Sequence, residues 1–203
     1  MTEALDVGEP GYVSRETIER LDRLAGLVRK WNGAVRLVAN GEAIWGRHLE
    51  DSLQLLPLLP EGTEPAIDLG SGAGFPGLVL AIASARPFHL VEADRRKAAF
   101  LMEAVRVTNA PGTVHAGRLE TIALCPTPLI TARALAPLPK LLTMVKRFLR
   151  PDTVCLFLKG RSVNGELSQA EKVWRMRVTK IPSRTDADAC VLRISGIRHV
   201  ADR

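Results

Sequence analysis

The chain has 203 residues, of which 46% are hydrophobic and 25% charged, and its formal net charge at pH 7 is +6. A chain of this length and composition is typical of a globular protein with a substantial core. No apolar run approaches the roughly 20 residues that a membrane-spanning helix needs, which excludes an integral membrane protein of that kind.

The chain begins with an acidic stretch, MTEALDVGEP, that has no basic segment followed by an apolar one. A secretory signal would need that layout, so we expect a loose tail over 1–12 and a cytoplasmic protein. Ser14 then provides a helix N-cap, and apolar residues recur at helical spacing from Ile18 to Trp31. Trp31 is therefore predicted to be a core residue rather than a platform for a flipped RNA base.

A second helix is predicted over about 42–56, ending at Pro57. His48 and Asp51 lie three positions apart on it and so share one face. A catalytic pair is one interpretation, and a polar pair that holds the helix to the rest of the protein is the favoured one. Residues 1–60 are thus predicted to form a helical N-terminal cap.

Beyond this cap, short apolar runs alternate with helical patterns. The strand-like runs are AIDL, FHLVE, TVHA, PLITA and TVCLFL, and the helical ones are PGLVLAIASA, DRRKAAFLMEAVR and LPKLLTMVKRFL. This alternation predicts a mostly parallel sheet with helices on both faces. The runs WRMRVTKI and ACVLRISGI would close it as a terminal pair. The expected protein is a single α/β domain over 1–203, with its core over 61–203.

The stretch AIDLGSGAGFPG, residues 66–77, places four glycines directly after the first of these strands. In an open parallel sheet, ligands bind beyond the carboxyl ends of the strands. Gly70, Gly72 and Gly74 lack Cβ atoms where the backbone must bend and approach a ligand closely. Pro76 suits the start of the helix that follows. A simple turn does not need three alternating glycines, so the sequence predicts a ligand site here.

A nicotinamide dinucleotide is the rival ligand for this loop. Gly72, Gly74 and Gly77 satisfy the spacing G-x-G-x-x-G, but that match starts late after the strand and contains a proline. If the spacing is counted from Gly70, the third glycine position is Phe75 and the pattern fails. An NAD-dependent oxidoreductase therefore stays an alternative.

Two carboxylates help to choose between the ligands. Glu92, at the end of the second strand, can bind both ribose hydroxyls of NAD or of S-adenosylmethionine. Asp68, beside the loop, would repel a pyrophosphate but suits a donor with an amino group and a sulfonium charge. The spacing thus favours the Rossmann-like fold of S-adenosylmethionine-dependent methyltransferases.

More of the chain resembles one family, the bacterial 16S ribosomal RNA guanine-N7 methyltransferases, also called ribosomal small subunit methyltransferase G or glucose-inhibited division protein B. The similar segments occur in family order from about residue 13 to 161: WNGAVRLVA, WGRHLEDSLQLL, DLGSGAGFPG, VEADRRKAAFL, GRLE, TARALAPL and FLKGR. The block joining RHLEDS to DLGSGAGFPG is specific to this family, whereas the glycine motif alone is not.

The resemblance implies S-adenosylmethionine as cofactor, with Gly70 and Phe75 against it. Leu119 and Glu120 would contact its adenine end, and Arg133 would lie near the reaction centre. No metal is implied.

The resemblance also places Arg118 and Lys159 against RNA. Relatives carry an Arg-His pair before the last strand, whereas this chain reads SRTDADACVLRI, where Arg184 could supply a phosphate contact. Residues 140–203 hold 14 Lys and Arg against 6 Asp and Glu, which is what a polyanion-binding surface needs. The expected partner is 16S rRNA or the small ribosomal subunit, bound by a monomer.

The implied reaction needs no general base, because guanine N7 carries a lone pair and no proton. We therefore expect direct in-line attack, with catalysis by positioning and no essential catalytic side chain. The alternatives are a methyltransferase with another substrate, an NAD-dependent oxidoreductase and a non-catalytic RNA-binding module. Cys125, Cys155 and Cys190 have no metal-like spacing and are expected to be reduced core thiols.

Overall fold

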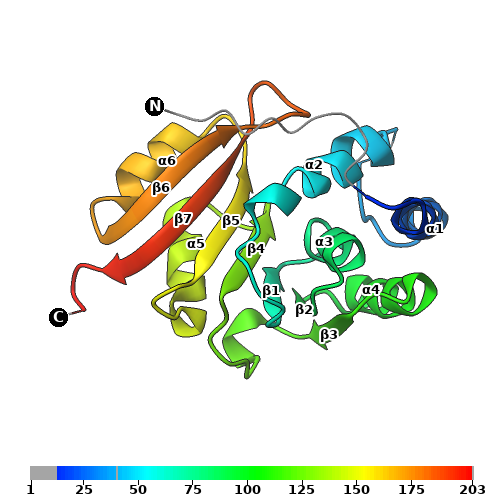
Figure 1. The fold of residues 1–203 in the computed structure, drawn as a ribbon, viewed down its shortest axis with the longest axis horizontal. Helices are drawn as coiled ribbons and strands as arrows, with labels where there is room; N and C mark the ends of the chain where they lie inside the picture. Colours follow the sequence, from blue (N-terminus) through cyan, green and yellow to red (C-terminus); the bar gives the residue numbers. More distant parts are fainter. Residues whose placement is uncertain (1–12, 40, 203) are drawn as a thin grey trace.

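A seven-stranded sheet forms the centre of the computed structural model, which describes residues 13–39 and 41–202 (Figure 1). The tail predicted over 1–12 lies outside the described residues. The strands are β1 (Ala66–Leu69), β2 (Phe88–Glu92), β3 (Gly112–Ala116), β4 (Leu129–Arg133), β5 (Val154–Lys159), β6 (Trp174–Pro182) and β7 (Cys190–His199). Their spatial order is β3-β2-β1-β4-β5-β7-β6.

The first five strands are parallel, and β7 pairs antiparallel with both β5 and β6. The predicted α/β fold with a mostly parallel sheet is therefore confirmed, as is the terminal strand pair. Because β7 is antiparallel to β5, the β6–β7 loop lies at the same edge of the sheet as the carboxyl ends of β1 to β5. The loops at this edge form the candidate site described below.

Helices cover both faces of the sheet (Figure 1). They are α1 (Arg15–Asn32), α2 (Glu50–Leu53), α3 (Gly77–Ser84), α4 (Arg95–Thr108), α5 (Leu138–Val145) and α6 (Val163–Ala170). Strand β5 shows the two faces: Leu156 and Leu158 pack into the cluster with α1, α3 and α4, whereas Cys155 and Phe157 pack into the cluster with α5 and α6. This period of two is what a strand buried on both faces requires.

The helical N-terminal cap begins as predicted. The Ser14 hydroxyl accepts a hydrogen bond from the Thr17 amide at 3.2 Å, and Leu21, Leu24 and Val28 are fully buried. The Trp31 ring packs edge-on against Phe100, with the ring centroids 5.8 Å apart. Trp31 thus packs on the core as predicted, although it is only partly buried.

The second cap helix differs from the prediction of one helix over 42–56. A π-helical turn at Trp45–Leu49 runs into α2, which already ends at Leu53, and Pro57 lies inside a short 3₁₀ turn instead of ending the helix. The side chain of Gln54 donates to the main-chain carbonyl of Asp51 at 3.0 Å. This bond satisfies a carbonyl at the end of the helix and so stabilises the early stop.

Two other features depart from the sequence-based picture. Helix α6 was not predicted, because VNGELSQA contains residues that are poor helix formers and has no clear apolar period. Cys155 and Cys190 are buried free thiols as expected, but Cys125 is exposed, which corrects its assignment to the core. Cys125 lies in an irregular segment before β4 rather than in a strand. Among the described residues, no helix is long and apolar enough to cross a membrane.

Candidate functional site

The glycine loop between β1 and α3 has the backbone that its sequence predicts. Gly70, Gly72 and Gly74 have φ angles of +65°, +55° and +90°, a region that other residues rarely adopt. A Cβ atom added to Gly70 would lie 2.7 Å from Cδ1 of Leu135, which comes from the loop after β4. The glycine loop therefore packs closely against the loop that follows β4, with no space for a side chain at Gly70.

Glu92 ties this loop to the end of β2. Its Oε2 accepts a hydrogen bond from the Gly72 amide at 2.9 Å, and its Oε1 accepts one from the Asp94 amide at 2.8 Å. A carboxylate has about four acceptor positions, so Glu92 keeps capacity for hydroxyl donors. Contact with a ribose stays a prediction for this residue.

Asp68 is fully buried at the end of β1 and is only partly satisfied. Its Oδ1 accepts a hydrogen bond from Thr131 at 2.6 Å, whereas its Oδ2 has no hydrogen-bond partner among the described residues. Burial raises the pKa of Asp68 to about 6, against the hydrogen bond from Thr131 and the nearby charge of Arg133. The Ser71 side chain and the Gly77 amide also lower this pKa, so Oδ2 lies close to donors but lacks a hydrogen bond of good geometry.

These features suit S-adenosylmethionine better than a dinucleotide. The Asp68 carboxylate lies at the start of the loop, where a pyrophosphate would meet a like charge. A Cβ atom on Gly77, at the start of α3, would overlap the Asp68 side chain, so a glycine is needed for this close packing. The residues present therefore fit the phosphate-free ligand.

The turn after β3 reaches the same region. The Gly117 amide donates to the main-chain carbonyl of Glu92 at 2.9 Å, which places the short turn Leu119–Thr121 next to the end of β2. Leu119 is buried in the core, whereas Arg118 and Glu120 are exposed. Their predicted contacts, to adenine for Leu119 and Glu120 and to RNA for Arg118, stay predictions.

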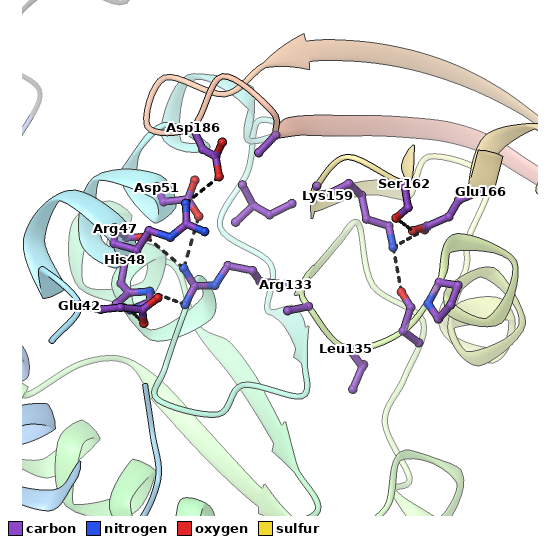
Figure 2. Close-up of a pocket in the computed structure, with 16 residues that line it drawn as sticks. Glu42, Arg47, His48, Asp51, Arg133, Leu135, Lys159, Ser162, Glu166 and Asp186 are labelled. Atoms are coloured by element: carbon purple, nitrogen blue, oxygen red, sulfur yellow. Dashed lines mark hydrogen bonds and ion pairs between the residues drawn. The ribbon is translucent and has the colours of Figure 1, made fainter. Parts of the chain in front are cut away.

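Arg133, at the end of β4, joins the cap to the core (Figure 2). Its Nη1 lies 3.3 Å from Oδ2 of Asp51, and its Nη2 donates to Nδ1 of His48 at 2.9 Å. The guanidinium also lies over the Phe75 ring, 5.1 Å from its centroid, and His48 stacks on that ring. These contacts confirm the structural interpretation of His48 and Asp51, and they place Arg133 beside Phe75 of the glycine loop.

Both ring nitrogens of His48 are engaged. Because Arg133 can only donate, Nδ1 of His48 must accept, and Nε2 therefore carries the proton that it donates to Glu42 at 3.0 Å. Burial lowers the pKa of His48, and the charge of Arg133 lowers it further, against the opposing effect of Glu42. His48 is thus a neutral bridge with no nitrogen left to act as a base.

A cavity of about 650 Å³ opens at the carboxyl ends of β4 and β5 (Figure 2). The cap, the loop after β4, the start of α6 and the β6–β7 loop all contribute to its wall. Its charged lining residues are four acids and three bases: Glu42, Asp51, Glu166, Asp186, Arg47, Arg133 and Lys159. Each base forms an ion pair with one of the acids, and the formal balance is one negative charge.

Lys159 and Glu166 form the second side of this cavity. The Lys159 ammonium lies 2.6 Å from Oε2 of Glu166 and donates to the carbonyl of Ala136 at 2.8 Å. Glu166 also accepts from the Leu138 amide at 2.7 Å, at the start of α5. The Lys159 side chain is 8% exposed, so it lies in the cavity wall rather than on the outer surface. Its predicted contact with RNA stays a prediction.

The β6–β7 loop closes the cavity from the cap side. Thr185 donates to Oδ1 of Asp51 at 2.8 Å, and the Arg184 amide donates to the Gln54 side chain at 3.0 Å. Arg47 and Asp186 add an ion pair of 2.8 Å. Sequence reasoning missed this docking, because no local pattern reports contacts between segments more than 120 positions apart.

Comparisons with known proteins agree with this architecture. The family model described as rRNA small subunit methyltransferase G matches residues 17–189. The "Ribosomal RNA small subunit methyltransferase G" of Rhodospirillum centenum is 54% identical over 187 residues, which cover 91% of this chain and 87% of that protein. The protein of the same name from Gluconobacter oxydans is 48% identical, with 93% and 98% covered.

Solved structures show the same fold at low sequence identity. An O-methyltransferase from Bacillus cereus in complex with S-adenosylhomocysteine is 14% identical, with a TM-score of 0.59 over 86% of this chain and 90% of its own. A TehB-like S-adenosylmethionine-dependent methyltransferase from Corynebacterium glutamicum is 16% identical, with a TM-score of 0.58 over 87% and 99%. The fold is therefore the Rossmann-like methyltransferase fold, as predicted.

Proposed function

We propose that this chain, which belongs to the rRNA small subunit methyltransferase G family, methylates N7 of one guanosine in 16S ribosomal RNA with S-adenosylmethionine as donor. The donor supplies an electrophilic methyl group on a sulfonium. The protein is proposed to act in the cytoplasm as a monomer, on free 16S rRNA or on the small ribosomal subunit.

The donor is proposed to lie along the glycine loop. Gly70 and Phe75 would contact it directly, with Gly72 and Gly74 shaping the loop that holds it. Glu92 would bind ribose hydroxyls through its remaining acceptor capacity, and the unpaired Oδ2 of Asp68 favours a ligand with an ammonium group. An NAD-dependent oxidoreductase is disfavoured for the same reason, since a diphosphate would lie close to this carboxylate.

The choice of N7 as nucleophile comes from the resemblance to guanine-N7 methyltransferases, and the charge of the cavity agrees with it. Methylation at N7 converts a neutral purine into a cation, and the lining has one more carboxylate than it has bases. Such a wall stabilises the charge that develops on the base. Because the N7 lone pair attacks the methyl carbon without losing a proton, the neutral and fully engaged His48 is no obstacle to turnover.

Arg133 is then a positioning residue rather than an acid or base. It is held by Asp51 and His48 and lies over Phe75, so it can orient the target base beside the glycine loop. Arg118 and Arg184 are proposed to contact phosphates, and Lys159 is proposed to contact the nucleotide that enters the cavity. Holding the two reacting atoms in line can contribute on the order of 7–11 kcal/mol to lowering the barrier.

Small subunits from a strain that lacks the gene provide the test. They are incubated with the protein and S-adenosylmethionine, and the 16S rRNA is then cleaved chemically at N7-alkylated guanosines. One new cleavage site, absent without the protein, is the expected result. Methylation at another atom would remove the N7 assignment. Calorimetry with S-adenosylhomocysteine and with NADH tests the cofactor separately, and tight binding of NADH alone would refute the methyltransferase proposal.

A further inference from the structure

The two C-terminal strands carry a row of arginines on one side of the sheet. Along β6, Trp174, Met176 and Val178 pack into the cluster with α5 and α6, so the residues between them face the other way. Arg175, Arg177, Arg193 and Arg198 make up this row, which we call the arginine face. All are exposed except Arg193, which is partly exposed.

Cross-strand pairing brings these arginines together. Arg175 lies directly opposite Arg198, Arg177 is opposite Ser195, and Arg193 is opposite Thr179. Directly opposite residues of an antiparallel pair point to the same side, with Cβ atoms about 5 Å apart. The pair Arg175–Arg198 thus places like charges side by side, an arrangement that destabilises a sheet unless an anion relieves it.

No acidic side chain in the described part of the chain forms an ion pair with these four arginines. Arg175 donates only to main-chain carbonyls, those of Glu171 and Trp174. The cations of the cavity differ, since Arg47, Arg133 and Lys159 each pair with a carboxylate. The arginine face therefore keeps its positive charge for a partner, whereas the cations of the cavity are paired and its formal balance is one negative charge.

We propose that the arginine face binds phosphates of 16S rRNA beside the target guanosine and holds the RNA while that nucleotide enters the cavity. The proposal rests on the proposed function, because it assumes that the substrate is an RNA. Guanidinium groups suit it, since their planar donors match the oxygens of a phosphate. We assign the face to RNA rather than to an acidic protein because its positive charges form an extended row with no acid between them. Such a row matches the evenly spaced negative charges of a nucleic acid backbone.

The position of the face agrees with this role. Strand β7 begins at Cys190, directly after Ala189 in the cavity wall. At about 3.3 Å per residue, Arg193 lies roughly 10 Å along the strand from Cys190, and Arg198 roughly 26 Å. An RNA segment could therefore extend from the cavity over the arginine face without leaving the surface of the sheet.

The test compares two double variants of equal charge. R177Q/R193Q removes two cations of the arginine face, and R29Q/K30Q removes two exposed cations at the end of α1, on another part of the surface. A third variant, R177K/R193K, keeps the charge but not the planar donors. Binding to naked 16S rRNA and to small subunits is measured over a range of salt concentrations. Calorimetry with S-adenosylhomocysteine shows whether each variant keeps an intact cofactor site.

We expect R177Q/R193Q to bind naked 16S rRNA about tenfold more weakly, with a salt dependence reduced by about 1.4 to 1.8 in the log–log slope. R177K/R193K should keep the salt slope, and R29Q/K30Q should bind like the wild type. In the methylation assay the loss should appear in KM, with kcat unchanged at saturating RNA. R175Q/R198Q should weaken binding in the same way, and it should fold normally because it relieves a like-charge pair.

Failure of this proposal can be told apart from failure of the proposed function. A wild-type protein that methylates no RNA refutes the function itself. A wild type that methylates, together with an R177Q/R193Q variant that binds like R29Q/K30Q, overturns only the role of the arginine face. Weaker binding to subunits with unchanged binding to naked rRNA would assign the face to a ribosomal protein, which also overturns the proposal.

Discussion

Arg133 at the end of β4 and Asp51 in α2 form an ion pair, with Nη1 and Oδ2 3.3 Å apart. The two residues are 82 positions apart in the sequence, and their side chains are 20% and 14% exposed. Asp51 also accepts hydrogen bonds from Gln54 and Thr185. One carboxylate therefore connects the cap, the sheet and the β6–β7 loop around the cavity.

Replacing the Asp51 carboxylate should lower the stability of the whole protein. In Asp51→Ala, Arg133 loses its counter-charge and two donors lose their acceptor, so the free energy of unfolding should fall by about 2–4 kcal/mol. Urea denaturation measures the change. The control is Glu19→Ala, whose partner Arg15 is almost fully exposed, and there the loss should stay below about 1 kcal/mol. Equal effects in the two variants would contradict the joining role of Asp51.

Gly70→Ala should reduce cofactor affinity. The substitution forces a left-handed backbone on alanine, at a cost of about 1 kcal/mol, and pushes a methyl group against Leu135. Gly62→Ala is the matched control, because Gly62 has a φ of +101° but nothing within 4 Å of its added Cβ. Both variants should lose stability, and only Gly70→Ala should bind S-adenosylhomocysteine more weakly by calorimetry. Similar binding by both would argue against a ligand beside Gly70.

Asp68 should make stability depend on pH in an unusual direction. Burial raises its pKa from 3.8 to about 6, so between these values the folded state keeps a proton that the unfolded state has released. The stabilisation from Asp68 is then full below about pH 4 and is lost as the pH rises to about 6, by on the order of 3 kcal/mol. Urea unfolding of the wild type and of Asp68→Asn across this range isolates the effect, because the asparagine does not titrate. A constant difference between the two proteins would contradict it.

Cofactor binding should follow the opposite course. An ammonium group is attracted by the ionised Asp68 and not by the neutral acid, so affinity for S-adenosylhomocysteine should fall as the pH drops below about 6. Asp68→Asn should bind more weakly at pH 7.5 and lose this dependence. Calorimetry at several pH values separates the two effects, and an Asp68→Asn variant with wild-type affinity would remove Asp68 from the binding site.

Lys159 and Glu166 should behave as a coupled, mostly buried pair, with side chains 8% and 16% exposed. Lys159→Met and Glu166→Gln each leave one partner uncompensated and should destabilise the protein by about 2–4 kcal/mol. The double variant should cost clearly less than the sum, because neither charge remains. The exposed pair Lys146–Asp202 is the control, with an expected coupling below about 1 kcal/mol. Additive effects at Lys159 and Glu166 would refute the coupling.

The parts of the fold with strong local signals could be predicted from the sequence. Short strand-like runs predict all seven strands, and the positive φ angles of the glycine loop follow from the residue type. The π-helical turn at Trp45–Leu49 could not be predicted, because it changes the hydrogen-bond partners without changing the apolar pattern. Helix α6 is short and its apolar residues show only a weak helical spacing. Its formation therefore depends on packing against the rest of the protein more than on helix propensity.

The candidate site was harder to predict than the fold. Asp68, Glu92 and Arg133 lie at or near the carboxyl ends of parallel strands, where ligands of such sheets bind. Their part in a site could therefore be predicted. The partners that hold them in place are distant in sequence: Asp51 for Arg133, and Thr131 for Asp68. Glu166 was missed because it belongs to the unpredicted helix α6. Contacts of this kind depend on the folded arrangement of several loops, which no local pattern encodes.

The order of the strands has a consequence for synthesis of the chain. Strand β7 is made after β5 and β6 but lies between them, so β6 has no partner strand, and β5 only β4, until residues 190–199 have been made. Until then β5 presents a bare edge, the kind of surface that invites pairing with other chains. A premature stop before residue 190 would remove β7 and leave β6 without its partner strand. We expect such truncated chains to be degraded or to aggregate rather than to persist as a smaller enzyme.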